Sequence, residues 1–361
     1  MSARTRPRSN LVVMAGGGTG GHALPLLAVA EELRRRGRDV VFVGTRKGIE
    51  ARLAPAKGFP IEYIDIGGLK GVGWRRVLRT LWRLPISAAQ VVAWMRAVRP
   101  GAVFSMGGYV AGPTVLAALV GRVPVVAMEP NATPGVTNLR LGRYVHKTLL
   151  AMADTARYFP AAKTEVTGLP IRDEFFAIAP RPECSDLQLL ITGGSAGSRT
   201  LNRAARQSWP LFRSAEIPVR ILHQTGRDAF EETRAAFLES GLAGEVVPFI
   251  EDMPAAYASA DLVVSRAGAG AVAELAAAGK PSILTPFPYA ADQHQLRNAE
   301  AFERAGAARV ILDRDMNGAR LFQAVMELAP QRRRMGEAAR AMARPGATGR
   351  VADILEELID S

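Results

Sequence analysis

The feature that most constrains the fold is an alternation of short apolar runs with helical patterns along nearly the whole chain. A first series starts with "LVVMA" (residues 11–15) and continues through "VVFVG", "IEYIDI", "AVFSM", "PVVAM" and "KTLLAM". A second starts with "LQLLITGGS" (residues 187–195) and continues through "VRILHQTG", "EVVPFI", "DLVVSR", "PSILTP" and "ARVILD". Strands that alternate with helices favour parallel sheets built from βαβ units. The sequence therefore predicts an α/β protein.

The stretch "TEVTGLPIRDEF" (residues 164–175) interrupts this alternation, and we place a domain boundary near Pro170. A length of 361 residues suits two domains of about 150 residues or more each. We expect two doubly wound domains, with ligands at the carboxyl ends of their strands and in the cleft that the two domains would form.

Composition indicates a globular protein of the cytoplasm. Hydrophobic residues make up 48% of the chain and charged residues 22%, and no apolar run approaches the roughly 18 residues of a membrane span. The apolar run behind the basic first ten residues is too short for a secretory signal. The single cysteine, Cys184, excludes an intramolecular disulfide and fits a reducing compartment. The net charge of +12 favours anionic partners.

Three glycine-rich stretches follow predicted strands: "GGGTGGH" (16–22), "MGGYVAGP" (106–113) and "GGSAGS" (193–198). Glycine permits a close approach of the backbone, and the N–H groups at a helix N-terminus attract anions. Glycines can also serve only to make tight turns. Three such loops indicate more anionic contact than one mononucleotide needs.

Two common motifs match the sequence, but the rest of the chain does not support the function that either motif suggests. Gly16, Gly18 and Gly21 fit the dinucleotide fingerprint, but the second strand ends in Thr45 and Arg46 rather than in an acidic residue, and Asp39 lies at its other end. "GGSAG" (193–197) fits a hydrolase nucleophile elbow, for which Asp261 or Asp292 with His294 could complete a triad. That reading leaves the other two glycine loops unexplained.

Longer stretches resemble one family. In order they are "GGTGGH", "SMGGYVAGP", "EPNATPGVTN", "GLPIR", "GGSAGSRTLN", "RAGAGAVAELAAAGKPSILTPFP" and "DQHQLRNA". They are similar to the MurG family of N-acetylglucosaminyl transferases, which complete lipid II in bacterial cell-wall synthesis. The resemblance covers nearly the whole chain and implies a GT-B fold of two Rossmann-like domains. We expect an N-terminal domain at residues 1–168, completed by a C-terminal helix at 345–361, and a C-terminal domain at 169–344.

The resemblance implies inverting transfer of GlcNAc from UDP-GlcNAc to the C4 hydroxyl of the muramic acid sugar of lipid I. The donor and the acceptor each carry a diphosphate, which accounts for the surplus of glycine loops. It also implies a peripheral location on the cytoplasmic face of the inner membrane, with cell-wall synthesis and division proteins as partners. The alternatives are a glycosyltransferase for another acceptor and a UDP-GlcNAc 2-epimerase. A nucleic-acid binder is disfavoured, because aromatic content is 6% and basic runs match no recognised motif.

The resemblance also assigns residues. Glu274 would accept hydrogen bonds from both ribose hydroxyls, although a glutamate in the first turn of a helix could simply interact with the helix dipole. Ile250 would offer backbone groups to uracil, and Gln295 would contact the GlcNAc hydroxyls. The expected donor-binding residues are Thr19, Gly20, Gly21, Asn131, Arg172, Ser195, Ile250, Ala269, Gly270, Ala271, Val272, Ala273, Glu274 and Gln295, with His294 a further candidate. The expected acceptor-diphosphate residues are Gly17, Gly18, Gly107, Gly108 and Tyr109.

His22 is the candidate general base, since inversion requires a group that takes the proton of the attacking hydroxyl, and a helix N-terminus favours the neutral ring. His22 could instead be a structural or phosphate-contacting donor, and Glu129 is a rival base. No metal or cofactor is expected. "DRD" (313–315) resembles a metal-binding triplet of other sugar-nucleotide enzymes, but we interpret it as a carboxylate cap of a helix that starts near Asn317.

The basic segment "GWRRVLRTLWRLP" (73–85) indicates a membrane-surface helix. Its apolar side chains recur at helical spacing, and arginines fill much of the remainder. An ordinary core-facing helix with a solvated basic face would show the same pattern, and the lipid acceptor of the family favours the membrane. The residues concerned are Trp74, Leu78, Leu81 and Trp82 on the apolar face, with Arg75 and Arg79 beside them.

Overall fold

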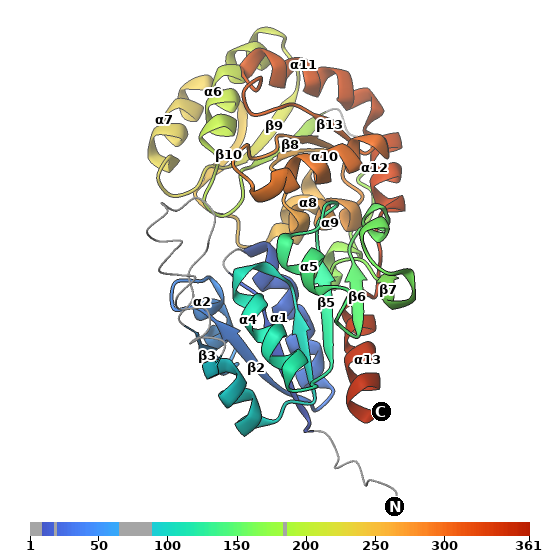
Figure 1. Ribbon diagram of the computed structural model, residues 1–361. Coiled ribbons are helices and arrows are strands. Elements are labelled where there is room, and N and C mark those ends of the chain that lie inside the picture. The colour runs from blue at the N-terminus through green and yellow to red at the C-terminus, as the bar shows by residue number, and fades with distance from the viewer. Residues whose placement is uncertain (1–8, 18–19, 65–88, 183–185) are drawn as a thin grey trace, which may run out of the picture. The chain divides into compact units, whose positions relative to one another are not determined.

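The computed structural model describes residues 9–17, 20–64, 89–182 and 186–361 (Figure 1). The chain divides into two compact units. Unit 1 comprises Met1–Ile171 and Gly346–Ser361, and unit 2 comprises Arg172–Pro345. Each unit is a parallel sheet covered by helices, as the alternating sequence pattern predicts.

Over its described residues, the sheet of unit 1 has seven strands in the order β3-β2-β1-β4-β5-β6-β7, all parallel. Its strands are β1 (Leu11–Ala15), β2 (Asp39–Gly44), β3 (Ile61–Tyr63), β4 (Ala102–Ser105), β5 (Val125–Glu129), β6 (Lys147–Leu150) and β7 (Thr164–Val166). Its helices include α1 (Gly20–Arg35), α2 (Glu50–Ala56), α4 (Gly108–Val120), α5 (Val136–Leu141) and α13 (Ala347–Asp360), with 3-10 turns η1 (Ala153–Tyr158) and η2 (Ala161–Lys163). Residues 89–98 are helical too. Residues 12–15 of β1 are fully buried, which explains why this strand reads as an unbroken apolar run.

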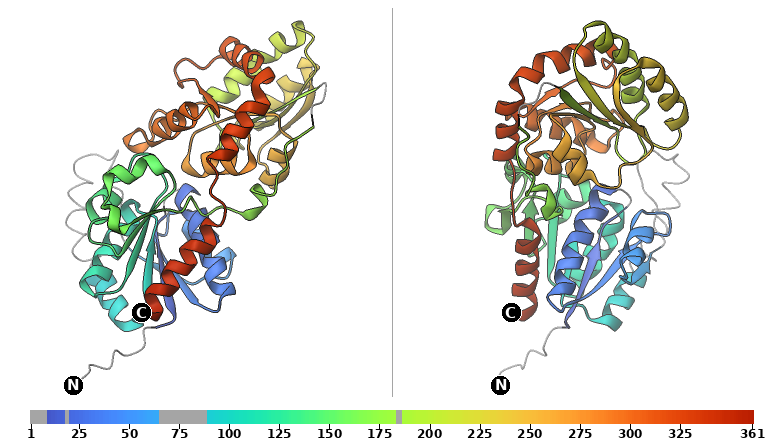
Figure 2. Two further views of the ribbon diagram at one scale, coloured as in Figure 1. Left: turned by 90° about the vertical axis from the view of Figure 1, so that its right-hand side faces the viewer. Right: turned by 180° about the vertical axis from the view of Figure 1, so that it is seen from behind.

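Helix α13 brings the end of the chain back to unit 1 (Figure 2). Its buried face includes Val351, Leu355 and Ile359. Its polar side forms ion pairs with the end of α1, where Nη1 of Arg36 lies 2.6 Å from Asp353 and 2.9 Å from Glu356. The amphipathic pattern of the last helix therefore has a partner on both its faces.

In the part of unit 2 that the structure describes, the sheet has six parallel strands in the order β10-β9-β8-β11-β12-β13. Its strands are β8 (Leu187–Thr192), β9 (Val219–Gln224), β10 (Ala243–Val247), β11 (Leu262–Ser265), β12 (Ser282–Leu284) and β13 (Ala308–Val310). Its helices are α6 (Arg199–Ser214), α7 (Phe230–Ser240), α8 (Met253–Ser259), α9 (Ala269–Ala278), α10 (His294–Arg304), α11 (Gly318–Leu328) and α12 (Arg332–Ala341). Short 3-10 turns are η3 (Asp173–Phe175), η4 (Ala291–Gln293) and η5 (Ala329–Gln331).

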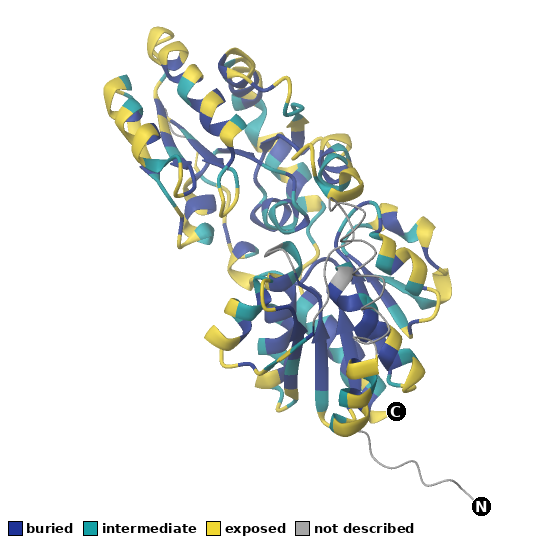
Figure 3. Cartoon of the chain, turned by 60° about the vertical axis from the view of Figure 1, so that its left-hand side comes forward, coloured by how far each residue is buried: buried dark blue, intermediate teal, exposed yellow. Residues whose placement is uncertain are grey.

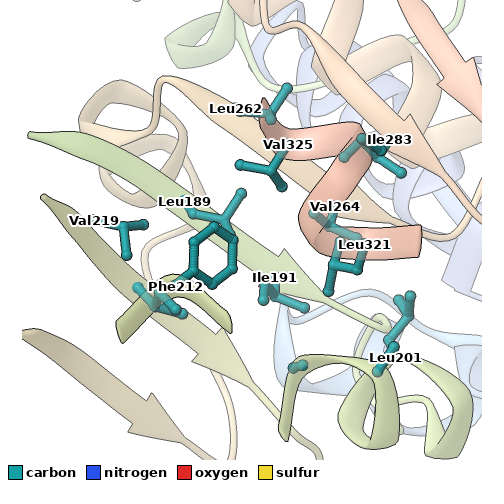
Figure 4. Close-up of a cluster of buried hydrophobic side chains, with 14 of the residues drawn as sticks. Leu189, Ile191, Leu201, Phe212, Val219, Leu262, Val264, Ile283, Leu321 and Val325 are labelled. Carbon is teal, nitrogen blue, oxygen red and sulfur yellow. The ribbon is translucent and has the colours of Figure 1, made fainter. Parts of the chain in front are cut away.

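One hydrophobic cluster holds α6 and α11 against the sheet of unit 2 (Figure 4). Leu189 and Ile191 on β8 meet Phe212 of α6 and Leu321 of α11, and all four side chains are at most 1% exposed. Colouring by burial shows the same layering in both units, with buried strands and exposed outer helix faces (Figure 3). The rigid layers place the strand ends, and therefore the loops that follow them.

The structure departs from the expected elements in three places. Residues 164–166 form the edge strand β7, although we expected the alternation to break there. The strand expected over residues 61–66 ends at Tyr63, and the helix expected from Leu24 begins at Gly20. Glycines lower helix propensity, which hides the first turn of α1 from the sequence pattern. In the part of the chain that the structure describes, no helix is long and apolar enough to cross a membrane.

Candidate functional site

The order of the strands reverses at one point in each unit, between β1 and β4 in unit 1 and between β8 and β11 in unit 2. Open α/β sheets bind ligands outside the carboxyl ends of the strands at such a switch point. The three glycine-rich loops follow β1, β4 and β8. Each of them therefore flanks a switch point of its own unit.

In unit 1 the first two glycine loops meet beside His22. Gly107 and Gly108 have φ angles of 74° and 81°, which favour glycine, and lie at the start of α4. A Cβ atom on Gly108 would lie 3.5 Å from Nδ1 of His22 and 3.9 Å from the carbonyl oxygen of Gly17. The first N–H groups of α4, Tyr109 among them, have no acceptor inside the helix and suit an anion. Gly17 and Gly108 of the predicted acceptor site thus lie close to His22.

His22 is the third residue of α1, so it lies at a helix N-terminus, as the sequence suggested. Its imidazole is partly exposed. Gly20 and Gly21 open the same helix, whereas Gly18 and Thr19 lie outside the described residues. The predicted membrane segment, residues 73–85, also lies outside them. The assignments on these residues stay predictions.

Glu129, the rival base, is engaged in organising the loop that follows β5. Its side chain is 1% exposed and accepts four hydrogen bonds. Oε1 accepts from the backbone N and from Nδ2 of Asn131, at 3.0 and 3.1 Å, and Oε2 accepts from the backbone N of Gly135 and from Nδ2 of Asn138, at 3.0 and 2.9 Å. Burial raises the pKa of Glu129, and these donors oppose the shift because they favour the carboxylate.

The same contacts fix Asn131, which we expected to reach the donor sugar. Its amide nitrogen donates to Glu129, and its backbone carbonyl accepts a hydrogen bond of 3.0 Å from Oγ1 of Thr155. Both its side chain and its main chain are therefore held by unit 1 itself.

In unit 2, Glu274 and Arg172 form an electrostatic pair next to two buried aromatic rings. Glu274 is the sixth residue of α9, so it lies in the second turn and not in the first, where the dipole explanation would place it. Burial raises the pKa of Glu274 to about 7, and the charge of Arg172 opposes the shift. The guanidinium of Arg172 lies 5.0 Å from the ring centre of Phe175, which packs on Tyr257 at 5.6 Å.

Gln224, which sequence reasoning missed, connects two predicted donor contacts. It ends β9 and is 2% exposed. Its Nε2 donates to the carbonyl of Gly194, at 2.7 Å, and its Oε1 accepts from the backbone N of Ile250, at 2.9 Å. The N–H of Ile250 is therefore used inside the protein, and its carbonyl is the group left for a base. The exposed Ser195 follows Gly194 in the loop that this bond holds.

Arg266, also missed, joins the loops after four strands of unit 2. It follows β11, and its Nη2 donates to Oγ of Ser198 at 2.7 Å, just after the loop that follows β8. Its Nη1 donates to the carbonyl of Thr285 after β12, at 3.0 Å, and to Oδ1 of Asp313 after β13, at 2.5 Å. Oδ2 of Asp313 accepts from Thr200 at 3.0 Å. One guanidinium thus sets the relative positions of these loops.

This network corrects the interpretation of "DRD". The cap of α11 is Asn317, whose Oδ1 accepts a hydrogen bond from the backbone N of Arg320 at 3.0 Å, so a carboxylate cap was wrong. Asp313 instead faces Arg266 across the sheet end. Amide caps are common at helix starts, and the sequence alone could not show that Asp313 had a cationic partner 47 residues earlier.

Gln295 joins the loops that follow β11 and β12. Its Oε1 accepts from the backbone N of Ala267 at 3.2 Å and of Phe287 at 2.9 Å, so its amide N–H groups remain as donors for a sugar hydroxyl. His294 begins α10, with Nε2 3.6 Å from Oδ2 of Asp292. Asp292 and Gln293 have φ angles of 49° and 55°, a conformation that surrounding structure must hold.

Unit 2 therefore gathers most of the predicted donor residues at its carboxyl edge, and unit 1 gathers the described acceptor residues and His22. Ala269, Gly270, Ala271, Val272 and Ala273 form the first turns of α9, which begins after Gly268. The N–H groups that precede Val272, whose own N–H donates to the carbonyl of Gly268, lie at the positive end of the helix dipole. Within the described residues, no group of three or more histidine, cysteine, aspartate or glutamate side chains is placed to hold a metal ion.

The chain matches two parts of a known enzyme family. Residues 12–150 match the glycosyltransferase family 28 N-terminal domain, and residues 188–358 match the glycosyltransferase family 28 C-terminal domain. Among solved structures, it is similar to the crystal structure of Acinetobacter baumannii MurG, with a TM-score of 0.82 and 34% identity over 97% of this chain and 100% of that chain. The predicted α/β class with two Rossmann-like domains of the GT-B type is confirmed.

Two relatives carry the same name, UDP-N-acetylglucosamine–N-acetylmuramyl-(pentapeptide) pyrophosphoryl-undecaprenol N-acetylglucosamine transferase. The one from Solibacter usitatus is 61% identical over 96% of this chain and 95% of its own length. The one from Halorhodospira halophila is 45% identical over 99% of both chains. The chain therefore belongs to the MurG family of N-acetylglucosaminyl transferases, within glycosyltransferase family 28.

Proposed function

We propose that this enzyme transfers GlcNAc from UDP-GlcNAc to the C4 hydroxyl of the muramic acid sugar in lipid I, forming lipid II. The observation that carries the proposal is the 61% identity to a relative of that name over almost the full length of both chains. The glycine loops at both switch points support it, because the two substrates bring two diphosphates.

Unit 2 binds the donor in this proposal. The ribose hydroxyls donate to Glu274, the guanidinium of Arg172 faces the diphosphate, and the carbonyl of Ile250 accepts from uracil. Gln295 donates to the GlcNAc hydroxyls. N–H groups at the starts of α6 and α9 stabilise the negative charge that develops on the leaving UDP, which is the part a metal ion plays in other transferases.

Unit 1 binds the acceptor. The amides at Gly108 and Tyr109 receive its diphosphate beside Gly17, while the N–H of Gly107 donates to Oγ of Ser105 at 3.2 Å and supports the loop. The C4 oxygen attacks the anomeric carbon of GlcNAc, and the bond between that carbon and the phosphate oxygen breaks with inversion. His22 accepts the proton of the hydroxyl. Glu129 serves as the support of the loop at 130–135, because its carboxylate is already saturated by four donors.

The lipid acceptor requires contact with the cytoplasmic face of the membrane, and two helices of unit 1 present a suitable surface. Leu116 and Val120 lie one turn apart on α4 and are 49% and 61% exposed, and Val136 and Leu139 on α5 are 53% and 47% exposed. Arg140 and Arg143 are exposed beside them. Exposed apolar side chains next to cationic ones are typical of proteins that bind anionic membrane surfaces.

The reaction itself is tested with labelled UDP-GlcNAc and a short-chain lipid I analogue. We expect a disaccharide product that depends on the acceptor, and we expect the rate to persist in the presence of a chelator, because amides and Arg172 take the place of a metal. Mass spectrometry of the product and release of UDP measure the outcome. Conversion of UDP-GlcNAc to its 2-epimer without acceptor, or a strict need for added Mg²⁺, would contradict the proposal.

The pKa of Glu274 gives the donor affinity a pH dependence. Because the pKa is about 7 in the free protein, the carboxylate that the ribose hydroxyls need is mostly protonated at pH 6 and mostly ionised at pH 8. We expect UDP-GlcNAc affinity to rise by up to about tenfold between these pH values, following the ionised fraction. Calorimetry on wild type and E274Q measures this rise.

The E274Q variant should bind more weakly and with little pH dependence, while E239Q, which alters an exposed carboxyl on α7, should behave as wild type. A wild-type affinity that is the same at pH 6 and pH 8 would show that Glu274 does not bind the ribose as a carboxylate.

Replacement of His22 by alanine should lower turnover by about 10²–10⁴-fold, the usual contribution of a general base. Its affinity for UDP-GlcNAc should change little, because His22 is not one of the expected donor contacts and the donor contacts of unit 2 are unchanged. Single-turnover measurements with saturating donor separate the two effects. Chemistry at the wild-type rate in H22A would exclude His22 as the base.

The membrane surface is tested with the double variant L116E/L139E. We expect it to lose most of its co-sedimentation with anionic vesicles, because two carboxylates would replace exposed apolar side chains that contact the membrane and would repel the lipid headgroups. Leu238→Glu is the matched control, since Leu238 is 71% exposed on α7 of unit 2. Equal vesicle binding by wild type, double variant and control would contradict the proposal that α4 and α5 contact the membrane.

A further inference from the structure

The side chain of Arg340, on α12, is bound by the main chain of two separate segments of unit 2. Its Nη1 donates to the carbonyl oxygens of Phe176 and Ala277, at 3.0 and 2.5 Å. Its Nη2 donates to the carbonyl of Ala278, at 3.2 Å, and to that of Ile178. All four acceptors are neutral carbonyls, and burial lowers the pKa of Arg340 from its usual value.

Each of these two segments lies next to one of the charged side chains that we propose as donor contacts, Glu274 in one case and Arg172 in the other. Ala277 and Ala278 end α9, and Glu274 lies one turn before Ala278 on the same helix. Phe176 directly follows η3, whose first residue is preceded by Arg172. A guanidinium is a planar fork with several N–H donors, so one side chain can bind both segments at once.

The packing around the guanidinium leaves it little freedom. A Cβ atom on Gly279 would lie 2.8 Å from Nε of Arg340. Gly279 is the C-cap residue of α9 and has a φ of 61°. A Cβ atom on Gly336, one turn before Arg340, would lie 2.7 Å from the carbonyl oxygen of Gly279. Helix α12 therefore packs closely against the end of α9, and this packing restricts the position of the Arg340 guanidinium.

A second cation fixes the other side of the same helix end. Lys280 is 3% exposed, and its Nζ donates to the carbonyl of Ala260 at the end of α8, at 2.8 Å. Cations at a helix C-terminus are favourable because they face the last carbonyls and the negative end of the dipole. Since Lys280 anchors α9 to α8, the contact of Arg340 with residues 176 and 178 is what joins the Arg172 segment to this anchored helix.

We propose that Arg340 is a positioning residue for donor binding, which holds the Arg172 segment in register with the Glu274 helix so that both side chains reach one UDP-GlcNAc. This rests on the proposed function, since it takes Arg172 and Glu274 as donor contacts. Arg340 itself touches no substrate in this account and acts through the two segments. A residue that merely stabilised the fold would lower the melting temperature without a specific link to Arg172.

A double-mutant cycle distinguishes these roles. UDP-GlcNAc affinity is measured by calorimetry, well below the melting temperatures, for wild type, R172M, R340M and R172M/R340M. If Arg340 acts through Arg172, each single variant weakens binding by about tenfold, while the double variant is no more than about twofold weaker than R172M, because interacting sites are not additive. R334M, which alters an exposed arginine of the same helix, should bind as wild type.

Kinetics with the same variants provide a second readout. R340M should raise the KM for UDP-GlcNAc while kcat at saturating donor stays within about twofold of wild type, since only uniform binding is lost. R340K keeps the charge but not the fork, so it should rescue the melting temperature more than the KM. If R340M does not fold, R340K alone decides, because a wild-type KM in R340K would overturn the proposal.

Independent effects in the cycle, which would make the double variant about a hundredfold weaker, or unchanged affinity in folded R340M, would also overturn it. A wild-type protein that does not bind UDP-GlcNAc would instead overturn the proposed function. The two failures are therefore distinguishable in the same set of measurements.

Discussion

The parallel hydrogen bonding of the two sheets is the constraint on which the rest of the structure depends. In a parallel sheet every strand needs a crossover, and all the strands present their carboxyl ends at one edge. With the strand order reversing between β1 and β4 and between β8 and β11, the crossovers diverge there and leave the following loops uncovered. The glycine loops, the start of α9 and His22 all take their positions from these two edges.

Positive charge in unit 2 is used to hold main chain as well as to meet a ligand. Arg266 and Arg340 donate to six carbonyl oxygens between them, Lys280 donates to a seventh, and Gln224 connects two loops with both ends of its amide. Such bonds keep loops from collapsing into the site while leaving the helix N-termini open. In the proposed reaction, loops held in this way would let neutral amides stabilise a diphosphate with little reorganisation.

Much of this could be predicted from the sequence. The alternation of apolar runs predicted two parallel sheets, and the position of the glycines after the strands predicted the loops at both switch points. The sequence failed where a side chain is paired across the fold. Asp313 was interpreted as a helix cap, whereas its partner Arg266 lies on the loop after another strand. Glu129 was the rival base, and the structure adds that the residues that follow it donate four hydrogen bonds to its carboxylate.

The sequence by itself determined the fold class, because periodicity of apolar residues and the local chemistry of turns are properties of neighbouring residues. The family followed from the resemblance of its motifs to those of the MurG family. Only the tertiary structure decided which polar side chains are free for a ligand and which are bound by the protein. The backbone N–H of Ile250 is bound by Gln224, and the amide of Asn131 by Glu129. The pKa of Glu274 likewise follows from burial and from Arg172, which lies 102 residues earlier. Desolvation and long-range pairing depend on packing in three dimensions, and a linear sequence does not display them.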